Sequence, residues 1–158
     1  MSEGFTPKRW VFFASCVPPK TTSQQKGAHA TADGGVRFFK KAKTITASNT
    51  LEAVLLPHKP SQPMAGIVSL SVEVVWPWRA SDVKTRTQQE RADRYGRIRS
   101  GVKPDCDNFV KMLQDALVSL RFIEGDELVS DLRVRKFFGE NPGITIELTQ
   151  LDEVEIPQ

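Results

Sequence analysis

The sequence predicts a single α/β domain of the α+β kind, in which a small mixed sheet packs on one main helix. The first supporting observation is size: 158 residues, 39% of them hydrophobic, suffice for one core without disulfide or metal support. The second is a segment of strict polar and apolar alternation, and the third is a segment with the periodicity of an amphipathic helix. We therefore expect one domain over residues 1–158.

The helix over residues 107–120 is the strongest signal in the chain, because its apolar side chains recur at helical spacing and share one face. They are Phe109, Met112, Leu113, Ala116, Leu117 and Leu120. We expect these side chains to be core contacts and not the lining of a ligand pocket.

The first third of the chain predicts a strand, a loop and a second helix. Residues 10–17 are β-prone and end at Pro18-Pro19, which predicts a strand. Residues 18–36 are rich in Thr, Ser, Gln, Gly and Lys, a composition typical of a mobile loop. A helix is expected over residues 48–56, with Ser48 or Asn49 as its cap and Pro57 at its end.

The middle of the chain holds the alternating segment and then a basic one. Residues 66–76 alternate between apolar and polar side chains up to Pro77, which predicts a half-buried strand. Residues 79–103 carry eight basic and three acidic side chains and no apolar stripe. This basic segment is either a solvated loop or short surface helix, or an arm that contacts phosphates.

The chain after the main helix predicts two more strands. A turn is expected around Glu124-Gly125-Asp126, followed by strands over residues 128–138 and 144–148. Asn141-Pro142-Gly143 marks the turn between these two strands.

Charge is distributed unevenly although the net charge is only +3. Residues 1–103 hold 17 basic and 7 acidic side chains, whereas residues 104–158 hold 5 basic and 12 acidic ones. The basic part indicates a polyanionic binding partner, and the acidic part indicates a functional role for carboxylates.

Several classes of protein and site are disfavoured. No stretch approaches 18 uninterrupted apolar residues, and the first nine residues lack the order of a signal peptide. Cys16 and Cys106 are far apart and form no CxxC pair, so a disulfide scaffold or Cys-based zinc site is not expected. His29 and His58 lie in polar surroundings typical of exposed loops. We therefore expect a cytoplasmic protein whose chemistry does not depend on histidine.

Chemistry is concentrated in the segment around Asp105 and Asp107. Two carboxylates at i and i+2 point the same way only on extended backbone, and Pro104 disfavours helix just before them. Converging carboxylates suit Mg²⁺, which prefers oxygen ligands. Lys111 follows Asp107 by four residues and is expected to lie near the same carboxylates. Alternatively, Asp107 is only a helix N-cap.

A third carboxylate is available beyond the main helix, from Glu124, Asp126 or Glu127. It can reach the other two only if the chain returns alongside the helix, which the strand expected over residues 128–138 permits without requiring it.

The combined pattern resembles the RusA family of Holliday junction resolvases, found in phages, prophages and their bacterial hosts. The resemblance rests on residues 103–111 (KPDCDNFVK), 115–117 (DAL) and 125–129 (GDELV). Looser support comes from the Val17-Pro18-Pro19-Lys20 stretch and from the last expected strand.

The resemblance implies a homodimeric, Mg²⁺-dependent endodeoxyribonuclease that nicks four-way junctions symmetrically in recombination and repair. Mn²⁺ is an expected substitute. By position, Asp105, Asp107 and Asp126 would be the catalytic, metal-binding carboxylates, and Lys111 the catalytic lysine. Such an ion would activate a water and neutralise developing charge, and Lys111 would stabilise the transition state or orient that water.

Phosphate contacts are expected from the basic residues nearest this motif. They are Lys20, Arg79, Arg97, Arg99 and Lys103. Such contacts bind shape and backbone charge, which makes binding dependent on salt.

Two departures from the family pattern concern the number of metal ions. Gly125 stands where the family usually has an acid, so a carboxylate is missing unless Glu124 or Glu127 replaces it. Leu128 stands where a glutamine is common. Two alternatives therefore stay open: a non-catalytic DNA-binding or architectural protein that retains the fold, and a metal-dependent nuclease for flaps or other branched DNA.

Overall fold

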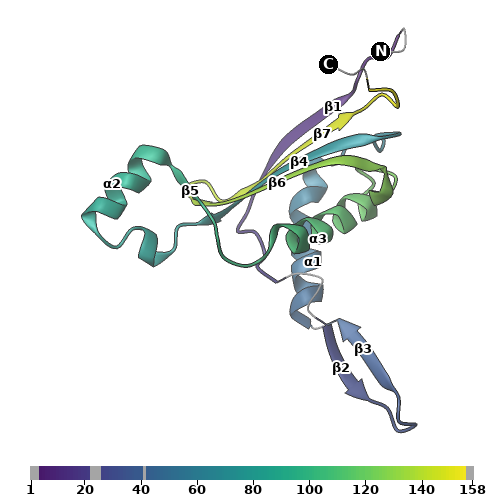
Figure 1. Ribbon diagram of the computed structural model, residues 1–158, viewed down its shortest axis with the longest axis horizontal. Coiled ribbons are helices and arrows are strands. Elements are labelled where there is room, and N and C mark those ends of the chain that lie inside the picture. The colour runs from purple at the N-terminus through teal and green to yellow at the C-terminus, as the bar shows by residue number, and fades with distance from the viewer. Residues whose placement is uncertain (1–3, 22–25, 41, 156–158) are drawn as a thin grey trace.

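The computed structural model describes residues 4–21, 26–40 and 42–155, which form a mixed α/β domain with two sheets (Figure 1). One sheet has five strands in the order β1-β7-β4-β6-β5, and the other is the β2-β3 hairpin. The strands are β1 (Arg9–Ser15), β2 (Lys26–Ala30), β3 (Val36–Lys40), β4 (Val68–Pro77), β5 (Arg97–Arg99), β6 (Val129–Gly139) and β7 (Gly143–Gln150). The helices are α1 (Ala42–Leu55), α2 (Arg86–Tyr95) and α3 (Cys106–Ser119), with 3₁₀ turns η1 (Leu56–His58), η2 (Ala80–Asp82) and η3 (Asp126–Leu128).

The central strand β4 explains why the sheet is mixed. It is parallel to β6, because the chain between these two strands crosses over through α2 and α3. It is antiparallel to β7. Its alternating apolar side chains are buried from Val68 to Trp76, as the sequence pattern predicts. Trp76 meets Phe109 of α3 edge to face at 5.6 Å between ring centroids. The prediction of a strand packed on the main helix is therefore confirmed.

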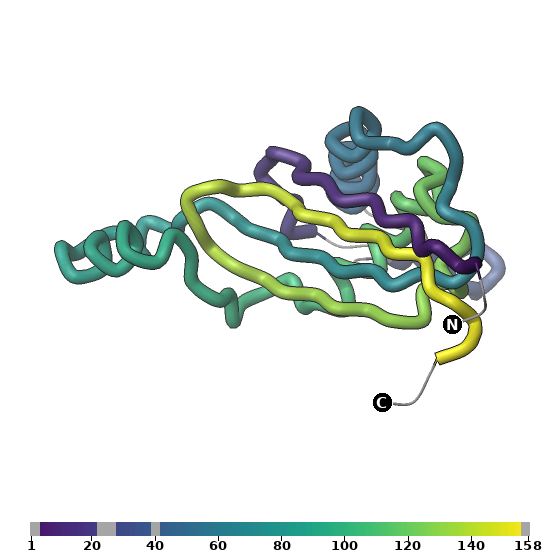
Figure 2. Tube along the Cα trace, turned by 90° about the horizontal axis from the view of Figure 1, so that it is seen from above, coloured from purple at the N-terminus to yellow at the C-terminus, as the bar shows by residue number. Residues whose placement is uncertain are grey.

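Both α1 and α3 lie on one side of the five-stranded sheet, behind it in the view of Figure 2. The sequence predicted one main covering helix and a second helix beginning only at residue 48. α1 begins instead at Ala42, and its early residues Thr44 and Ala47 are buried. That difference arose because the first turns of α1 are polar and carry no apolar stripe that local reasoning could detect.

The opposite side of the sheet, called the open face here, carries ion pairs in place of helices. Its central Glu73 accepts a hydrogen bond from Arg97 at 2.7 Å and pairs with Arg135 on the next strand. Arg9 and Glu147 form a second, more exposed pair at 2.8 Å. The sheet therefore has one buried apolar face and one exposed face, on which these ion pairs lie beside apolar side chains such as Phe13 of β1.

The polar segment 18–36 differs from the predicted loop because it contains β2, while residues 22–25 lie outside the described residues. β2 pairs with β3 in a hairpin that projects from the body of the domain (Figure 1). Its turn relies on Gly34, whose φ of 85° favours glycine, and on the bond from Thr31 N–H to the Gly35 carbonyl. Val36 and Phe38 of this hairpin are 60% and 74% exposed.

The basic segment 79–103 contains η2, α2 and β5, so the short surface helix anticipated there is present. α2 begins at a capping box between Thr85 and Gln88 and ends at Gly96, whose φ is 69°. It projects from the β5 edge of the sheet (Figure 1). Among the described residues, none of the helices has the length and apolar character needed to span a membrane.

Candidate active site

The approach to α3 is held by a lysine from the neighbouring strand. Lys136 of β6 donates hydrogen bonds from Nζ to the carbonyls of Val102 at 2.7 Å and Pro104 at 2.8 Å. Ser100 N–H in turn donates to the Lys136 carbonyl at 3.0 Å. These bonds fix the backbone just before Asp105 without using a carboxylate.

Asp105 occupies the N-cap position of α3 on extended backbone, with φ −66° and ψ 150°. Its carbonyl accepts the Phe109 N–H at 3.0 Å, but its side chain makes no capping hydrogen bond. Asp107 lies inside the first turn, because the helix begins at Cys106, one residue earlier than predicted. The expectation of extended backbone is therefore confirmed for Asp105 and wrong for Asp107, and the N-cap alternative for Asp107 is wrong as well.

Asp105, Asp107 and Lys111 are exposed, and within the described part of the chain none of them makes an ion pair or side-chain hydrogen bond. The predicted pair between Asp107 and Lys111 lies on one helix face but forms no salt bridge among these residues. A negative carboxylate in the first turn is favoured by the helix dipole. The N-terminal end of α3 thus presents two uncompensated carboxylates with a cation one turn further on.

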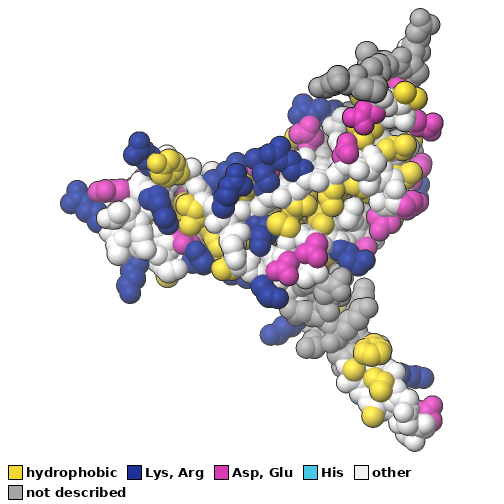
Figure 3. Space-filling view, viewed as in Figure 1, with side chains coloured by type: hydrophobic (Ala, Val, Ile, Leu, Met, Phe, Trp, Pro, Cys, Tyr) yellow, Lys and Arg dark blue, Asp and Glu magenta, His cyan; other side chains and the backbone are white. Residues whose placement is uncertain are grey.

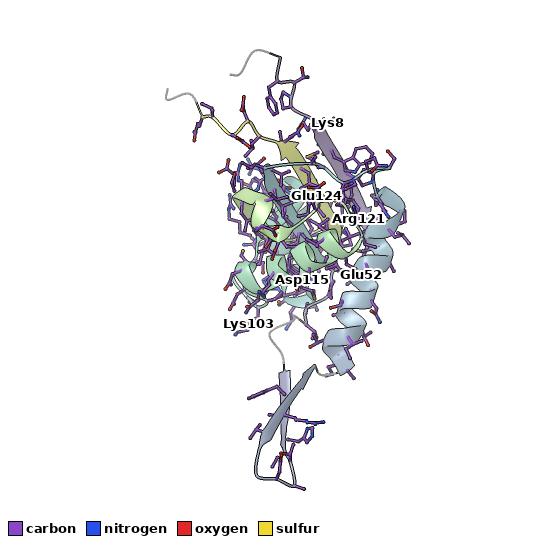
Figure 4. All side chains as sticks on the ribbon, turned by 90° about the vertical axis from the view of Figure 1, so that its right-hand side faces the viewer. Lys8, Glu52, Lys103, Asp115, Arg121 and Glu124 are labelled. Carbon is purple, nitrogen blue, oxygen red and sulfur yellow. The ribbon has the colours of Figure 1, made fainter. Side chains whose placement is uncertain are left out.

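Asp126 lies at the other end of the same helix, as the first residue of η3. Figure 4 labels Lys103, which precedes α3, Asp115, which lies within it, and Glu124, which follows it. A helix of 14 residues is about 21 Å long at 1.5 Å per residue. In the described ranges 4–21, 26–40 and 42–155, no group of three Asp, Glu, His or Cys side chains is placed to hold a metal ion. One copy of the chain therefore places Asp105 and Asp107 at the start of α3 and Asp126 beyond its other end.

Gly125, the position that departs from the family pattern, is buried beneath a neighbouring acid. A Cβ at residue 125 would collide with the carboxylate of Glu127, which occupies that space. The Glu127 side chain therefore lies directly over Gly125.

Two of the five expected phosphate-binding residues are already bound within the chain. Arg79 forms a two-point contact with the buried Asp82, with Nη2–Oδ1 at 2.7 Å and Nε–Oδ2 at 2.9 Å. The hydrogen bonds from Arg79 hold the pKa of Asp82 below its usual range. Arg97 pairs with Glu73 and stacks on Phe137 at 4.0 Å. Both guanidiniums therefore hold the α2 arm and β5 against the sheet.

The remaining three, Lys20, Arg99 and Lys103, are exposed. Further basic side chains of α2 are exposed too, namely Arg86, Arg91 and Arg94. Figure 3 shows Lys and Arg gathered on the α2 arm and the adjoining part of the sheet, while acidic side chains are more frequent toward the termini. The basic surface therefore lies at the α2 end of the molecule.

Lys136 is the residue of this site that sequence reasoning missed. The strand prediction over residues 128–138 included it, but no spacing rule connects a strand lysine to backbone carbonyls 32 and 34 residues earlier. Only the pairing of β6 beside β5 and the approach to α3 reveals its position.

Comparison with known proteins gives concordant results. The sequence model of the family described as Endodeoxyribonuclease RusA matches residues 17–149. A Lactococcus phage r1t protein named crossover junction endodeoxyribonuclease rusA is 31% identical over 131 residues, which cover 83% of this chain and 90% of the relative. The Bacillus subtilis protein YqaN, described as uncharacterized, is 29% identical over 133 residues, covering 84% and 87% of the two chains.

Proposed function

The chain belongs to the RusA family of endodeoxyribonucleases, and from this premise we propose that it resolves four-way DNA junctions by cutting two opposing strands symmetrically. The activity would serve recombination and repair in the cytoplasm of a bacterium, whether encoded by the host or by a phage. The protein would act as a homodimer, because two cuts related by a two-fold axis require two sites related in the same way.

The observation that carries this proposal is the state of the carboxylates at the N-terminal end of α3. Asp105 and Asp107 are exposed, and the nearest organising cation, Lys136, binds backbone carbonyls instead of either carboxylate. Exposed acids held on a fixed backbone and left without a cation are suited to an external cation.

Mg²⁺ is the proposed cofactor, with Mn²⁺ as a substitute, because carboxylate oxygens are the ligands that these ions prefer. The residues of a single copy do not fit the expected set of three carboxylates, since α3 separates Asp126 from Asp105 and Asp107. The complete set therefore has to be sought beyond one chain.

Lys111 and the basic surface have roles that follow from charge. Lys111 is exposed on the same side of α3 as Asp107, where its ammonium would stabilise negative charge developing on a phosphate. Arg99 and Lys103 lead directly into the site and would position the DNA backbone beside it. Arg79 and Arg97 would attract the DNA by their positive charge more than by direct phosphate contacts, because each is bound to a carboxylate of its own chain.

The test of this proposal is cleavage of a synthetic four-way junction by the purified protein in Mg²⁺. We expect paired nicks at symmetric positions, loss of cutting in Lys111→Ala, and retention of junction binding by that variant. Asp105→Asn should abolish cutting as well, and Asp131→Asn is its matched control, because Asp131 is an exposed acid on the open face of the sheet, opposite to the side that α3 covers.

A protein that binds junctions but cuts no branched DNA in either ion would exclude catalysis and favour an architectural role. Cutting of flaps with junctions left intact would instead assign a different substrate. A panel of four-way, three-way, flap and linear DNAs separates these outcomes.

A further inference from the structure

The β2-β3 hairpin exposes an apolar face that is left open by the rest of the chain as far as the structure describes it. Cross-strand neighbours in an antiparallel pair point to the same side, and the register pairs Ala28 with Phe38 and Ala30 with Val36. All four are exposed, and Phe38 is the most exposed large hydrophobic residue among those described. Figure 3 shows apolar side chains gathered on the projecting hairpin. Apolar side chains clustered on a projecting element mark an interaction site.

The opposite face of the hairpin is polar, and the segment around it is basic. His29 and Arg37 are paired in the register and are exposed on the side away from the apolar face. Residues 18–43 hold six basic residues and one acid, Asp33. The Asp33 carboxylate is bound within the turn by a neighbouring hydroxyl and a backbone N–H. The hairpin therefore combines an aromatic side chain with positive charge, as surfaces that bind nucleic-acid strands do.

The chain that leads into the hairpin is anchored beside the start of α3. Trp76 donates a buried hydrogen bond from Nε1 to the Pro18 carbonyl at 2.8 Å. The same indole contacts Phe109, which lies four residues beyond Asp105. Figure 4 shows the hairpin extending from the end of the domain at which Lys103 is labelled. The hairpin and the candidate active site therefore belong to the same end of the molecule.

A branch point in DNA offers a surface that matches the apolar face of the hairpin. In an intact duplex the bases are stacked on one another, so the duplex presents phosphates and polar base edges. Apolar side chains that enter between base steps unstack them and contact the base faces instead. At a branch point the stack is already interrupted, which lowers the cost of such a contact. Stacking on an aromatic ring tolerates any sequence, because every base has a π-face.

A second copy of the chain is a poorer partner for the same face. Two hairpins packed against each other would bring together two segments that each carry six basic residues and one acid, and these segments would repel. A polyanion is attracted by the same charge. The charge of the segment therefore favours DNA as the occupant.

We propose that the β2-β3 hairpin enters the branch point of a bound junction and that Phe38 stacks there on an exposed base, with Val36 beside it. This inference rests on the proposed function, because it concerns the substrate that the protein would cut. The hairpin would distinguish branched from linear DNA, whereas the basic side chains of α2 would bind the phosphates of either. Arg37 would contact the DNA backbone on the opposite side of the hairpin.

The test is binding in EDTA, which prevents cleavage, to a four-way junction and to a linear duplex with the sequence of its arms. We expect Phe38→Ala to weaken junction binding by about 5-fold to 100-fold, as loss of one base–aromatic stack does, and to leave duplex binding unchanged. Phe38→Trp keeps a stacking ring and should bind junctions like wild type, whereas Phe38→Leu should not. Val154→Ala is the matched control, because Val154 is an exposed apolar residue beyond β7 and outside the hairpin.

A fluorescent base analogue, aminopurine, locates the contact on the DNA. One junction carries the analogue at the branch point and another carries it in the middle of an arm. Because stacking alters the emission of this base, we expect wild type to change the signal at the branch point and not in the arm. Phe38→Ala should abolish that change. An unchanged signal at the branch point, or an equal response in the arm, would overturn the inference.

The remaining outcomes assign the hairpin a different role. Equal loss of junction and duplex binding in Phe38→Ala would make it a general DNA contact. Unchanged binding with a loss of self-association, measured by sedimentation, would assign its apolar face to a second copy. Either result overturns the inference.

Neither binding measurement depends on cleavage, so failure of this inference is distinguishable from failure of the proposed function. A wild type that responds at the branch point but cuts no DNA would support the inference and exclude catalysis. A wild type that cuts junctions while Phe38→Ala binds them equally well would retain the proposed function and overturn the inference.

Discussion

The carboxylates Glu73 and Glu147 of the open face differ from those at the N-terminal end of α3 in whether they form ion pairs within the chain. On the open face, Glu73 is shared by Arg97 and Arg135, and Glu147 is paired with Arg9. At the start of α3, Asp105 and Asp107 have no such partner among the described residues. Asp131 of the open face also forms no ion pair among the described residues, so the absence of a partner at Asp105 and Asp107 gains its meaning from the family motif in which these two residues stand.

The largest expected effect comes from Asp105→Asn, the substitution that tests whether the unpaired acids serve chemistry. We expect junction cleavage to fall by about 100-fold or more, since a group acting directly on developing charge contributes on that scale. The unfolding midpoint should stay unchanged, because the Asp105 side chain makes no capping hydrogen bond. Rate measurements and thermal unfolding on one preparation check both parts, and a parallel loss of stability would contradict the comparison.

Lys136→Met is expected to have the next largest effect, because it removes the cation that fixes the approach to α3. Two backbone carbonyls lose their donor, which costs about 1–3 kcal/mol of unfolding free energy. Displacement of Asp105 should also slow cleavage, by about 10-fold to 100-fold. Arg133→Met, an exposed change on the open face of the same strand, is the control. Full cleavage by Lys136→Met would mean that Asp105 needs no such support.

Glu73→Gln tests the paired side of the comparison. Arg97 and Arg135 would lose the carboxylate that they share, and we expect a loss of about 1–3 kcal/mol in urea unfolding with little change in cleavage. Glu147→Gln removes a more exposed pair, in which the Arg9 and Glu147 side chains are 63% and 37% accessible, and should cost less stability than Glu73→Gln. A large cleavage defect in Glu73→Gln would place the open face in the catalytic machinery.

The smallest expected effect concerns the pH dependence of stability. Hydrogen bonds from Arg79 lower the pKa of Asp82 in the folded state. Its stabilising contribution is therefore fully present above the unfolded pKa of about 3.9 and is lost as the pH falls through the folded value. Asp82→Asn should make the unfolding midpoint depend less on pH below about 4. A midpoint profile that coincides with that of wild type would assign the acid-side loss to other groups.

Most of the fold was accessible to local reasoning because the alternation of β4 and the helical spacing of α3 are strong periodic signals. Each predicted strand and the main helix are present, with ends shifted by a few residues. The early turns of α1 and the strands β2, β3 and β5 were missed, since none of these segments carries a periodic apolar pattern of its own.

The candidate site, too, was predictable where it depends on local sequence and not where it depends on packing. Its residue types and their local arrangement at 103–111 were readable, because Pro104 and the onset of the apolar pattern place Asp105 on extended backbone. The location of Asp126 at the far end of α3 was not readable, and neither was the role of Lys136. Both depend on which strand runs beside which helix.

The sequence by itself determined the family, the main helix and the carboxylates that carry the proposed chemistry, because these depend on short-range spacing. Only the tertiary structure decided which charges are free. Arg97 looks like a phosphate ligand in the sequence, yet Glu73 of β4 engages it across the sheet. The family pattern groups Asp126 with Asp105 and Asp107, yet a helix about 21 Å long separates them within one copy of the chain. Charge and spacing are properties of the chain, whereas pairing and distance are properties of the packed molecule.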